Sequence, residues 1–439
     1  MAVFNVYDLA ILGPGALLTA FLSVRFSLGT RALVGLTSYV PTVQQTTGSK
    51  KQLSETVDTS SLVMVPMNAA TVLQLPEYSS LESLLYSTLL MIVVAALYTL
   101  CSYLGWMTYG TVSLLLSASV FLLALVSLMV VSFLSRLTSA EDKIYCIVYS
   151  SVGFIGSIAY FAMEPKGIFM WSPEGAADAA ASLLKSAVQK ALQTSHVIQT
   201  TDGSSFLDNI EAPLSLLGVI FALLAAYITA VMHGSTLRFA RAFHSHLSPP
   251  AWAEKYMARF PMDSTRLRFQ MILPVAILVF YMNMPMKEMF ALSSEACILA
   301  QSATLVLTGL LFILNSRILV ARYLETAFIA WYTVKHGKHK TKVEKTAAYT
   351  ILKAKADIVR LTSCKTAIQA IAPGVLYLSC GILSMGAYIY HRTKGDTMSE
   401  FTLAFVENSV GFVVSFVGVL WFIVCGFSLW LFRTGTLIY

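Results

Sequence analysis

The sequence predicts an all-α integral membrane protein, a polytopic helical bundle of about nine transmembrane helices. Of the 439 residues, 56% are hydrophobic and only 12% are charged, whereas an ordinary soluble domain carries about 25% charged residues. The mean hydropathy is +0.70. The apolar residues gather in windows long enough to cross about 30 Å of hydrocarbon. We therefore expect residues 1–439 to form a single membrane domain.

Nine apolar windows are long enough to serve as spans. They are Val6–Phe26, Leu85–Trp106, Tyr109–Leu134, Ile144–Met163, Pro213–His233, Phe269–Phe290, Cys297–Ala321, Thr366–Tyr390 and Phe405–Phe432. The first contains Gly13, Pro14 and Gly15, a combination that breaks or kinks helices. For this window, a full span and a re-entrant or interfacial segment both stay open.

The charges between the windows predict the orientation. Residues 335–365 carry nine Lys and Arg against two acids, and residues 234–268 carry six against two. Residues 164–212 carry six acids against three Lys. Loops rich in Lys and Arg stay on the cytoplasmic or matrix side. The two basic loops are therefore expected inside and the acidic loop outside, with the N-terminus outside and the C-terminus inside.

Three connecting segments have their own expected structure. Residues 27–84 are rich in Ser, Thr, Gln and Val and are expected to be an irregular inner-side loop. Residues 178–193 have helical apolar spacing and predict an amphipathic helix on the outer membrane surface. The spacing of the apolar residues from Val343 to Ile358 predicts a basic amphipathic helix. Either it binds anionic lipid, or it is a solvated helix that leads into the next span. Its expected lipid-facing lysines are Lys342, Lys345, Lys353 and Lys355.

The window that begins at Cys297 ends in a candidate polar cluster. Asn315, Arg322 and Glu325 are seven and three residues apart and share a helix face, whereas Arg317 lies on another face. Arg317 falls at the expected inner interface, where its side chain can reach the headgroups. The stripe formed by the other three requires a protein or water partner, and the expected partners are Gln369 or Asn283.

Prolines interrupt two of the later windows. Pro274, Pro285 and Pro373 are expected helix kinks, because each removes a backbone donor. A kink packed within the bundle and a broken helix that lines a permeation path both fit the sequence.

No catalytic constellation is visible in the sequence. It contains no phosphate-binding loop, dinucleotide fingerprint, nucleophile elbow or zinc-protease motif. The six cysteines form no CxxC pair and are expected to be small buried hydrophobes. We therefore expect no catalytic residue, no cofactor, no metal and no enzymatic activity. The net charge of +7 follows from the basic inner loops and does not call for nucleic acid.

Short ordered matches give the chain a resemblance to a known family. LPEY (Leu75–Tyr78), AEDKIYC (Ala140–Cys146), LRFA (Leu237–Ala240) and QAIAPGVL (Gln369–Leu376) occur with Pro274, Pro285 and the pair Arg317 and Arg322. In these residues the chain resembles the transmembrane protein 161 family over nearly its whole length. The resemblance implies a polytopic helical membrane protein without catalytic activity that modulates cation currents and takes part in stress protection.

Together these observations predict a regulator or structural partner of membrane complexes. Anionic lipids and other membrane proteins are the expected partners. One alternative is an accessory subunit of a large organellar complex, such as a mitochondrial one. Another is a channel or transporter with a polar cavity near Arg322. Endomembrane, plasma membrane and mitochondrial inner membrane all remain open.

Overall fold

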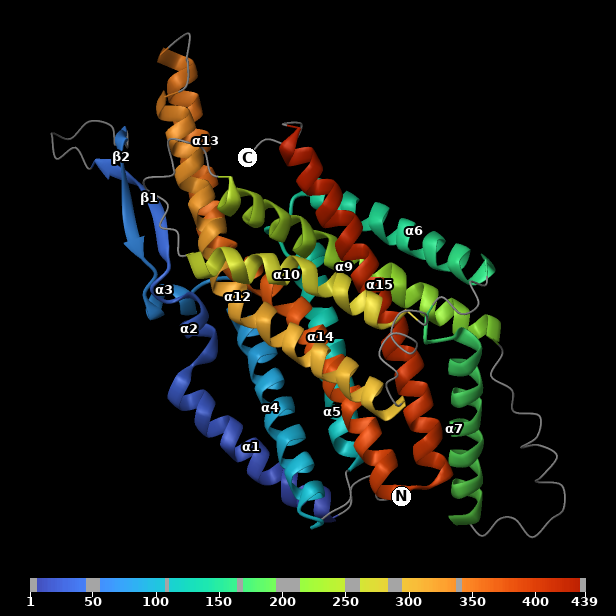
Figure 1. The fold of residues 1–439 in the computed structure, drawn as a ribbon. Coiled ribbons are helices and arrows are strands. Elements are labelled where there is room, and N and C mark those ends of the chain that lie inside the picture. Colours follow the sequence, from blue (N-terminus) through green and yellow to red (C-terminus); the bar gives the residue numbers. More distant parts are fainter. Residues whose placement is uncertain are drawn as a thin grey trace.

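The computed structural model describes residues 6–44, 56–106, 110–163, 169–194, 214–248, 261–282, 294–336 and 342–434. These residues are mostly helical, and Figure 1 shows long helices packed side by side. The elements are α1 (Val6–Phe26), α2 (Leu28–Leu33), β1 (Thr37–Gln44), β2 (Thr56–Pro66), α3 (Ala69–Leu73), α4 (Tyr78–Tyr103), α5 (Thr111–Met129), the π-helix η1 (Val130–Leu134), α6 (Ala140–Met163), α7 (Pro173–Thr194), α9 (Leu214–Leu247), α10 (Pro261–Phe280), α12 (Ser294–His336), α13 (Lys342–Leu361), α14 (Ser363–Lys394) and α15 (Thr397–Arg433).

The predicted all-α membrane architecture is confirmed in its coarse form. Within the described ranges, seven helices are long and apolar enough to cross a membrane: α4, α5 with η1, α6, α9, α12, α14 and α15. Two of the nine predicted spans are not among them. The apolar run of α1 is the shorter Ala10–Phe26. Of the predicted window Phe269–Phe290, only residues 269–282 are described, and residues 283–290 lie outside the described residues. The nine-span topology and its orientation stay predictions.

Helix α14 is the centre of the bundle. Of its apolar window 83% is buried, against 17% for α6. It crosses α12 at two glycines so closely that a Cβ on Gly309 would lie 2.6 Å from the Gly374 carbonyl oxygen. Further along the same crossing, a Cβ on Gly381 of α14 would lie 2.9 Å from the backbone carbonyl oxygen of Ser302 in α12. Small residues allow such backbone contact between membrane helices and increase their dispersion attraction.

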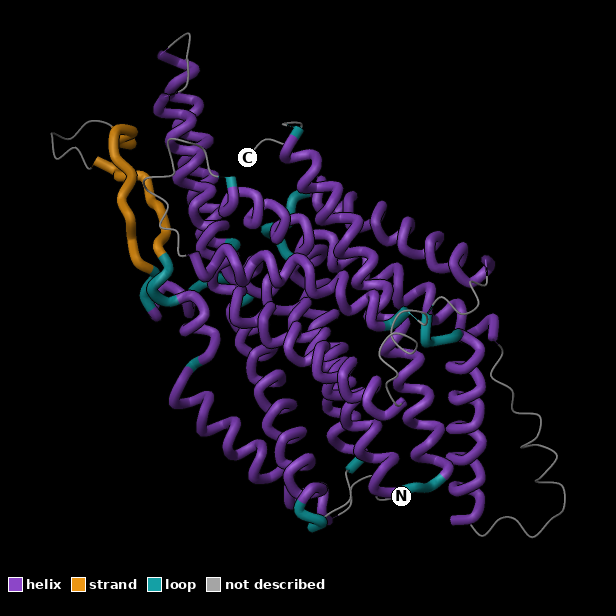
Figure 2. The backbone as a smooth tube through the Cα atoms, viewed as in Figure 1, coloured by secondary structure: helices purple, strands orange, loops and turns teal. Residues whose placement is uncertain are grey.

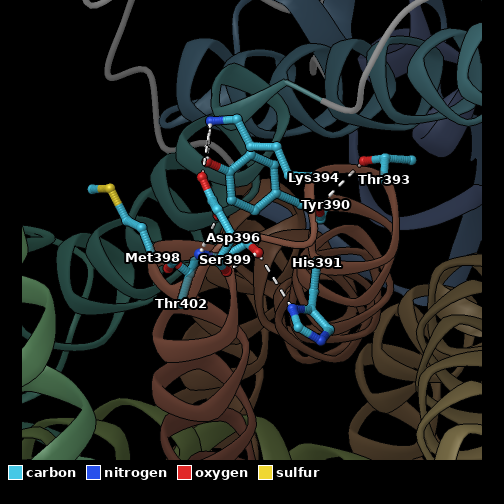
Figure 3. A network of polar contacts seen from close by, with 8 residues as sticks. All are labelled: Tyr390, His391, Thr393, Lys394, Asp396, Met398, Ser399 and Thr402. Atoms are coloured by element: carbon cyan, nitrogen blue, oxygen red, sulfur yellow. Dashed lines mark hydrogen bonds and ion pairs between the residues drawn. The ribbon is translucent and has the colours of Figure 1, made fainter.

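The turn that reverses the chain from α14 into α15 is fixed by local chemistry (Figure 3). Gly395 ends α14 in the left-handed conformation, with φ at 59°. The next residue, Asp396, caps α15 by accepting a hydrogen bond from the Ser399 backbone N–H at 2.8 Å. Lys394 Nζ donates to the Tyr390 hydroxyl at 2.9 Å and lies 4.0 Å from the Asp396 carboxylate. These contacts set the two most buried helices antiparallel.

The expectation that residues 27–84 are irregular is wrong for the described part of that segment. It holds the short helices α2 and α3, and α4 already begins at Tyr78. Between α2 and α3, strands β1 and β2 pair antiparallel, with Thr37 opposite Pro66. Their alternating Thr, Val, Ser and Tyr residues suit a half-buried strand. Figure 2 shows this hairpin in orange beside α13, at the end of the bundle that we call the α13 end.

The helix expected over residues 178–193 is present as α7, but its location differs from the expectation. The residues that it buries are Ala176, Ala177 and Ala179, and Leu184 of the predicted apolar face is exposed. Just before α7, the Trp171 indole N–H donates to the Ser415 hydroxyl of α15 at 3.2 Å. Figure 1 shows α7 running alongside the first half of α15. The small buried alanines let α7 pack against a neighbouring helix.

A matched pair of alanine substitutions tests the glycine contact. In Gly374→Ala the new Cβ would lie 2.7 Å from the Gly309 oxygen, so α12 and α14 must separate. We expect a loss of about 1–3 kcal/mol, the usual cost of overpacking. In the control Gly426→Ala, no heavy atom lies within 4 Å of the new Cβ, and alanine gains about 0.5–1 kcal/mol over glycine inside a helix. Thermal melting of both full-length variants in one detergent measures the difference, and equal midpoints would contradict the close crossing.

Candidate functional site

A cavity of about 570 Å³ lies within the bundle at its α13 end. Helices α9, α12 and α15 contribute their C-terminal halves to it, and α6 and α14 contribute their first turns. We call it the cationic cavity after four of its lining residues, which are Arg238, Arg241, Arg322 and Lys365. Its other polar lining residues include Ser132, Glu141, Asp142, His233, Ser235, Ser245, Thr326, Thr366, Gln369 and Ser428.

Two of the arginines reach the cavity because α9 is longer than predicted. The sequence ended this span at His233 and assigned Arg238 and Arg241 to a basic loop over residues 234–268. That boundary is wrong, because α9 continues to Leu247 and α10 begins at Pro261. The two arginines, three residues apart, therefore lie on one face of a packed helix. The helical spacing of Arg238, Arg241 and Ser245 was the signal in the sequence that could have predicted a longer helix. We expected a loop instead, because a basic run after an apolar window usually marks the end of a span.

The hydrogen-bond and ring partners of Arg238 and Lys365 are neutral groups. The Arg238 guanidinium donates to the Thr366 hydroxyl of α14 and lies 5.0 Å from the centroid of the Tyr323 ring of α12. Lys365 Nζ donates to the Thr138 hydroxyl at 2.8 Å. Only 3% of Lys365 is exposed. Neutral acceptors orient these cations without cancelling their charge.

Three of the four cations of the cavity have no ion pair within the described part of the chain. None of Arg238, Arg241 and Lys365 forms an ion pair with a described residue. The Arg241 Nε–H is buried and has no hydrogen-bond partner among these residues. Lys355 of α13 is outside the lining but near it, since partial desolvation and the positive charge of Arg241 lower the pKa of its ammonium group. Buried unpaired charges are costly, so the site favours an anion.

The two carboxylates of the lining lie at its rim. Glu141 and Asp142 are exposed residues of the first turn of α6. The cations lie deeper, since Lys365 is buried and Arg238 and Arg241 are half-buried. Water screens the exposed acids more than the buried bases. The lining therefore holds four cations against two carboxylates, and the carboxylates lie on its exposed side.

Gln369 lies in the wall of the cavity between α14 and the π-helix. Its amide nitrogen donates to the Ser132 hydroxyl at 3.3 Å, and its amide oxygen has no partner among the described residues. On the α9 side, a Cβ on Gly234 would lie 3.1 Å from that nitrogen, so glycine leaves room for the amide. The extra residue in a π-helical turn shifts the side chains that follow it. Gln369 was an expected partner of the polar stripe, and it lines the same cavity as Arg322 of that stripe, although its hydrogen bond is to Ser132.

Arg322 and Glu325 are neighbours, as their spacing predicts. Arg322 Nη1 donates to the two Glu325 carboxylate oxygens at 2.7 and 3.0 Å. Only 7% of Arg322 is exposed. Strand β1 approaches this pair, since burial and the Glu325 charge raise the pKa of Tyr39. Arg322 lines the cavity, and its partner Glu325 lies outside the lining.

Asn315 has a different partner from the two that the sequence suggested. Its amide nitrogen donates to the Gln270 side-chain oxygen at 3.0 Å and to the Arg266 carbonyl at 3.3 Å, both in α10. Asn315 and Gln270 are completely buried, and neither lines the cavity. Asn283 lies outside the described residues. The predicted stripe therefore divides, with Asn315 packed on α10 and Arg322 at the cavity.

Arg317 binds the end of a short helix. Its guanidinium donates to the carbonyl oxygens of Arg31 and Val34 at 3.3 and 3.1 Å. These carbonyls belong to the last turn and C-cap of α2, where a cation meets the negative end of the helix dipole. Arg317 thus joins α2 to α12 and stands apart from the cavity.

The predicted proline kinks do not break their helices. Helices α10 and α14 continue without interruption through Pro274 and Pro373. Pro285 lies outside the described residues. The interpretation of a broken helix lining a permeation path therefore has no counterpart in these two helices.

The predicted basic helix is present as α13, with a different buried face. Leu352, Ala356 and Val359 are buried, and α13 packs on α12 and β1. Ile351, from the predicted apolar face, is 68% exposed. Of the predicted lipid-facing lysines, Lys353 is half-buried and Lys355 exposed. Lys342 and Lys345 begin the helix.

Metal chemistry has no candidate site in the described ranges, where no group of three His, Cys, Asp or Glu could hold an ion. The six cysteines form no disulfide among the described residues, and five of them are buried. No family model, curated protein or solved structure matches the chain. The resemblance to the transmembrane protein 161 family accordingly stays a prediction.

Leucine substitutions test the amide pair between α12 and α10. Asn315→Leu and Gln270→Leu each leave a buried amide without its partner, and we expect each to cost about 1–3 kcal/mol. In the double variant neither amide remains, so its loss should be smaller than the sum of the two by about 0.6–1.7 kcal/mol, the coupling measured between polar pairs in membrane bundles. Denaturant unfolding of the four proteins gives the coupling. Strictly additive losses would show that the two amides do not interact.

Proposed function

We propose that the chain is a non-enzymatic multi-pass membrane protein that regulates other membrane proteins and binds an anionic ligand in its cationic cavity. The observation that carries this proposal is the presence of Arg238, Arg241 and Lys365 around one cavity without acidic partners among the described residues. The family resemblance agrees with a regulatory role. In the predicted orientation, the cavity opens toward the cytoplasm or matrix.

The lining suits a phosphate or carboxylate group. Two guanidinium groups and one ammonium group supply charged donors. Hydroxyl groups of Ser235 and Thr366 and the amide of Gln369 can complete the shell of an oxyanion. An anion bound here would repay the desolvation of cations that the described chain leaves uncompensated.

A transporter or channel is the second candidate, and the cavity itself favours it. The predicted alternative of a polar cavity near Arg322 agrees with the position of Arg322 in the lining. The protein can be reconstituted into sealed vesicles, and the flux of inorganic phosphate and of chloride can be measured. This measurement distinguishes a regulator from a transporter or channel. Flux that depends on Lys365 would support the transporter, and binding without flux would support the regulator.

Removing one buried cation should affect stability and binding in opposite directions. In Lys365→Met the ligand-free protein loses an uncompensated buried charge, so we expect its unfolding free energy to rise by about 1–2 kcal/mol. The same variant should lose most of the thermal stabilisation that anions such as inorganic phosphate and pyrophosphate give to the wild type.

Thermal melting with and without each anion, in one detergent, measures both effects. Arg392→Gln, an exposed cation at the other end of α14, is the control and should resemble the wild type. If neither a soluble anion nor an anionic lipid stabilises the wild-type protein, the proposed function is wrong. If Lys365→Met keeps the full stabilisation, the anion binds elsewhere.

A further inference from the structure

One wall of the cationic cavity belongs to the outer surface of the bundle. Among its lining residues, Phe427 of α15 is 58% exposed and Tyr145 of α6 is 56% exposed. Because these lining side chains are exposed, the cavity reaches the outer surface of the bundle at α6 and at α15, the two helices that pack on α9. We call this exposed part of the lining the opening. Figure 1 shows α6 and α15 near α9 at this end of the bundle.

The opening lies close to the ends of two spans. Tyr145 follows the start of α6 at Ala140 by five residues, and Phe427 precedes the end of α15 at Arg433 by six residues. At 1.5 Å per residue, both lie about 8–9 Å from their helix ends. In a bilayer this is the boundary between headgroups and acyl chains, where aromatic side chains are enriched.

The surfaces that lead away from the opening are apolar and uncovered in the described structure. On α6, Val148 and Val152 are more than half exposed, and on α15 the same holds for Phe422 and Ile423. These residues lie further from the helix ends than Tyr145 and Phe427 do, so the apolar surface extends along each helix toward its middle. An acyl chain could lie along either surface while its headgroup remains beside the cations.

We propose that the anionic ligand of the cationic cavity is the phosphate headgroup of a membrane lipid, which enters from the outer surface where Tyr145 of α6 and Phe427 of α15 are exposed, and leaves its acyl chains on these helices. This inference rests on the proposed function, since both require an anion at Arg238, Arg241 and Lys365. Basic pockets between membrane helices are known headgroup sites. A freely soluble phosphate would need only the polar part of the cavity, whereas a lipid also accounts for the apolar opening.

The number of unpaired cations selects among headgroups. Three cations without an ion pair in the described residues favour a phosphomonoester, with about −1.5 to −2 charges at neutral pH. A phosphodiester headgroup with one net negative charge should bind more weakly, and a zwitterionic headgroup more weakly still. The expected order of affinity is phosphatidic acid, then phosphatidylserine, then phosphatidylcholine.

The test uses the full-length protein, delipidated in a mild detergent. Dioleoyl phosphatidic acid, dioleoyl phosphatidylserine and dioleoyl phosphatidylcholine are titrated separately, and so are glycerol 3-phosphate and inorganic phosphate. Native mass spectrometry counts bound lipid, and thermal melting reports stabilisation. We expect phosphatidic acid to bind with one tight site at concentrations where glycerol 3-phosphate has no effect.

Variants locate that site. Arg241→Gln and Lys365→Met should each weaken phosphatidic acid binding about fivefold, which corresponds to about 1 kcal/mol for each cation at a membrane surface. Arg392→Gln should bind as the wild type does. The comparison of lipid with soluble phosphate needs only the wild-type protein, so it decides the question even if a variant fails to fold.

The outcomes separate the two proposals. If glycerol 3-phosphate or inorganic phosphate binds as tightly as the lipid, the lipid inference is wrong and the anion site stands. If no anion binds, both are wrong. If phosphatidic acid binds equally to the wild type and to both cavity variants, it covers the surface nonspecifically and the inference is also wrong.

Discussion

The close crossing of α12 and α14 is the constraint on which the rest of the structure depends. Gly309 and Gly374 bring the two backbones into contact, and Gly381 repeats the contact against Ser302. Because lipid tails are as apolar as leucine, burial from water does not drive this association, and close packing must supply the attraction. A helix held this tightly cannot rotate. The side chains that α14 carries before the crossing are therefore fixed in direction.

The consequence appears between one and three turns before Gly374 on the same helix. Lys365 and Gln369 lie on the cavity wall, and Lys365 is held there with only the Thr138 hydroxyl as a described partner. An unpaired buried ammonium would usually turn toward water or lose its proton. Here the tight packing opposes the first of these responses. A bound anion would favour the charged form of Lys365 and so remove the cost of burying it. Such costs are a usual way in which binding sites reduce stability.

Local patterns in the sequence predicted the helices and the contacts between residues that are close together in the chain. The apolar windows located the long helices, and the three-residue spacing of Arg322 and Glu325 predicted their contact. Partners far apart in sequence were missed: Asn315 meets Gln270, and Gln369 meets Ser132 across 237 residues. No periodicity encodes such pairs, because tertiary packing selects them.

The cationic cavity was missed for a related reason. A span was expected to end where charge begins, since charged side chains in hydrocarbon are costly. That rule fails when the charged turn is covered by other helices, as the second half of α9 is covered by α6, α14 and α15. Arg238 then belongs to the interior rather than to a loop. A basic run directly after an apolar window therefore has two physical meanings: an anchor at the membrane surface, or a helix that carries its cations into a protein-lined site. The helical spacing of Arg238, Arg241 and Ser245 around one cavity favours the second meaning here.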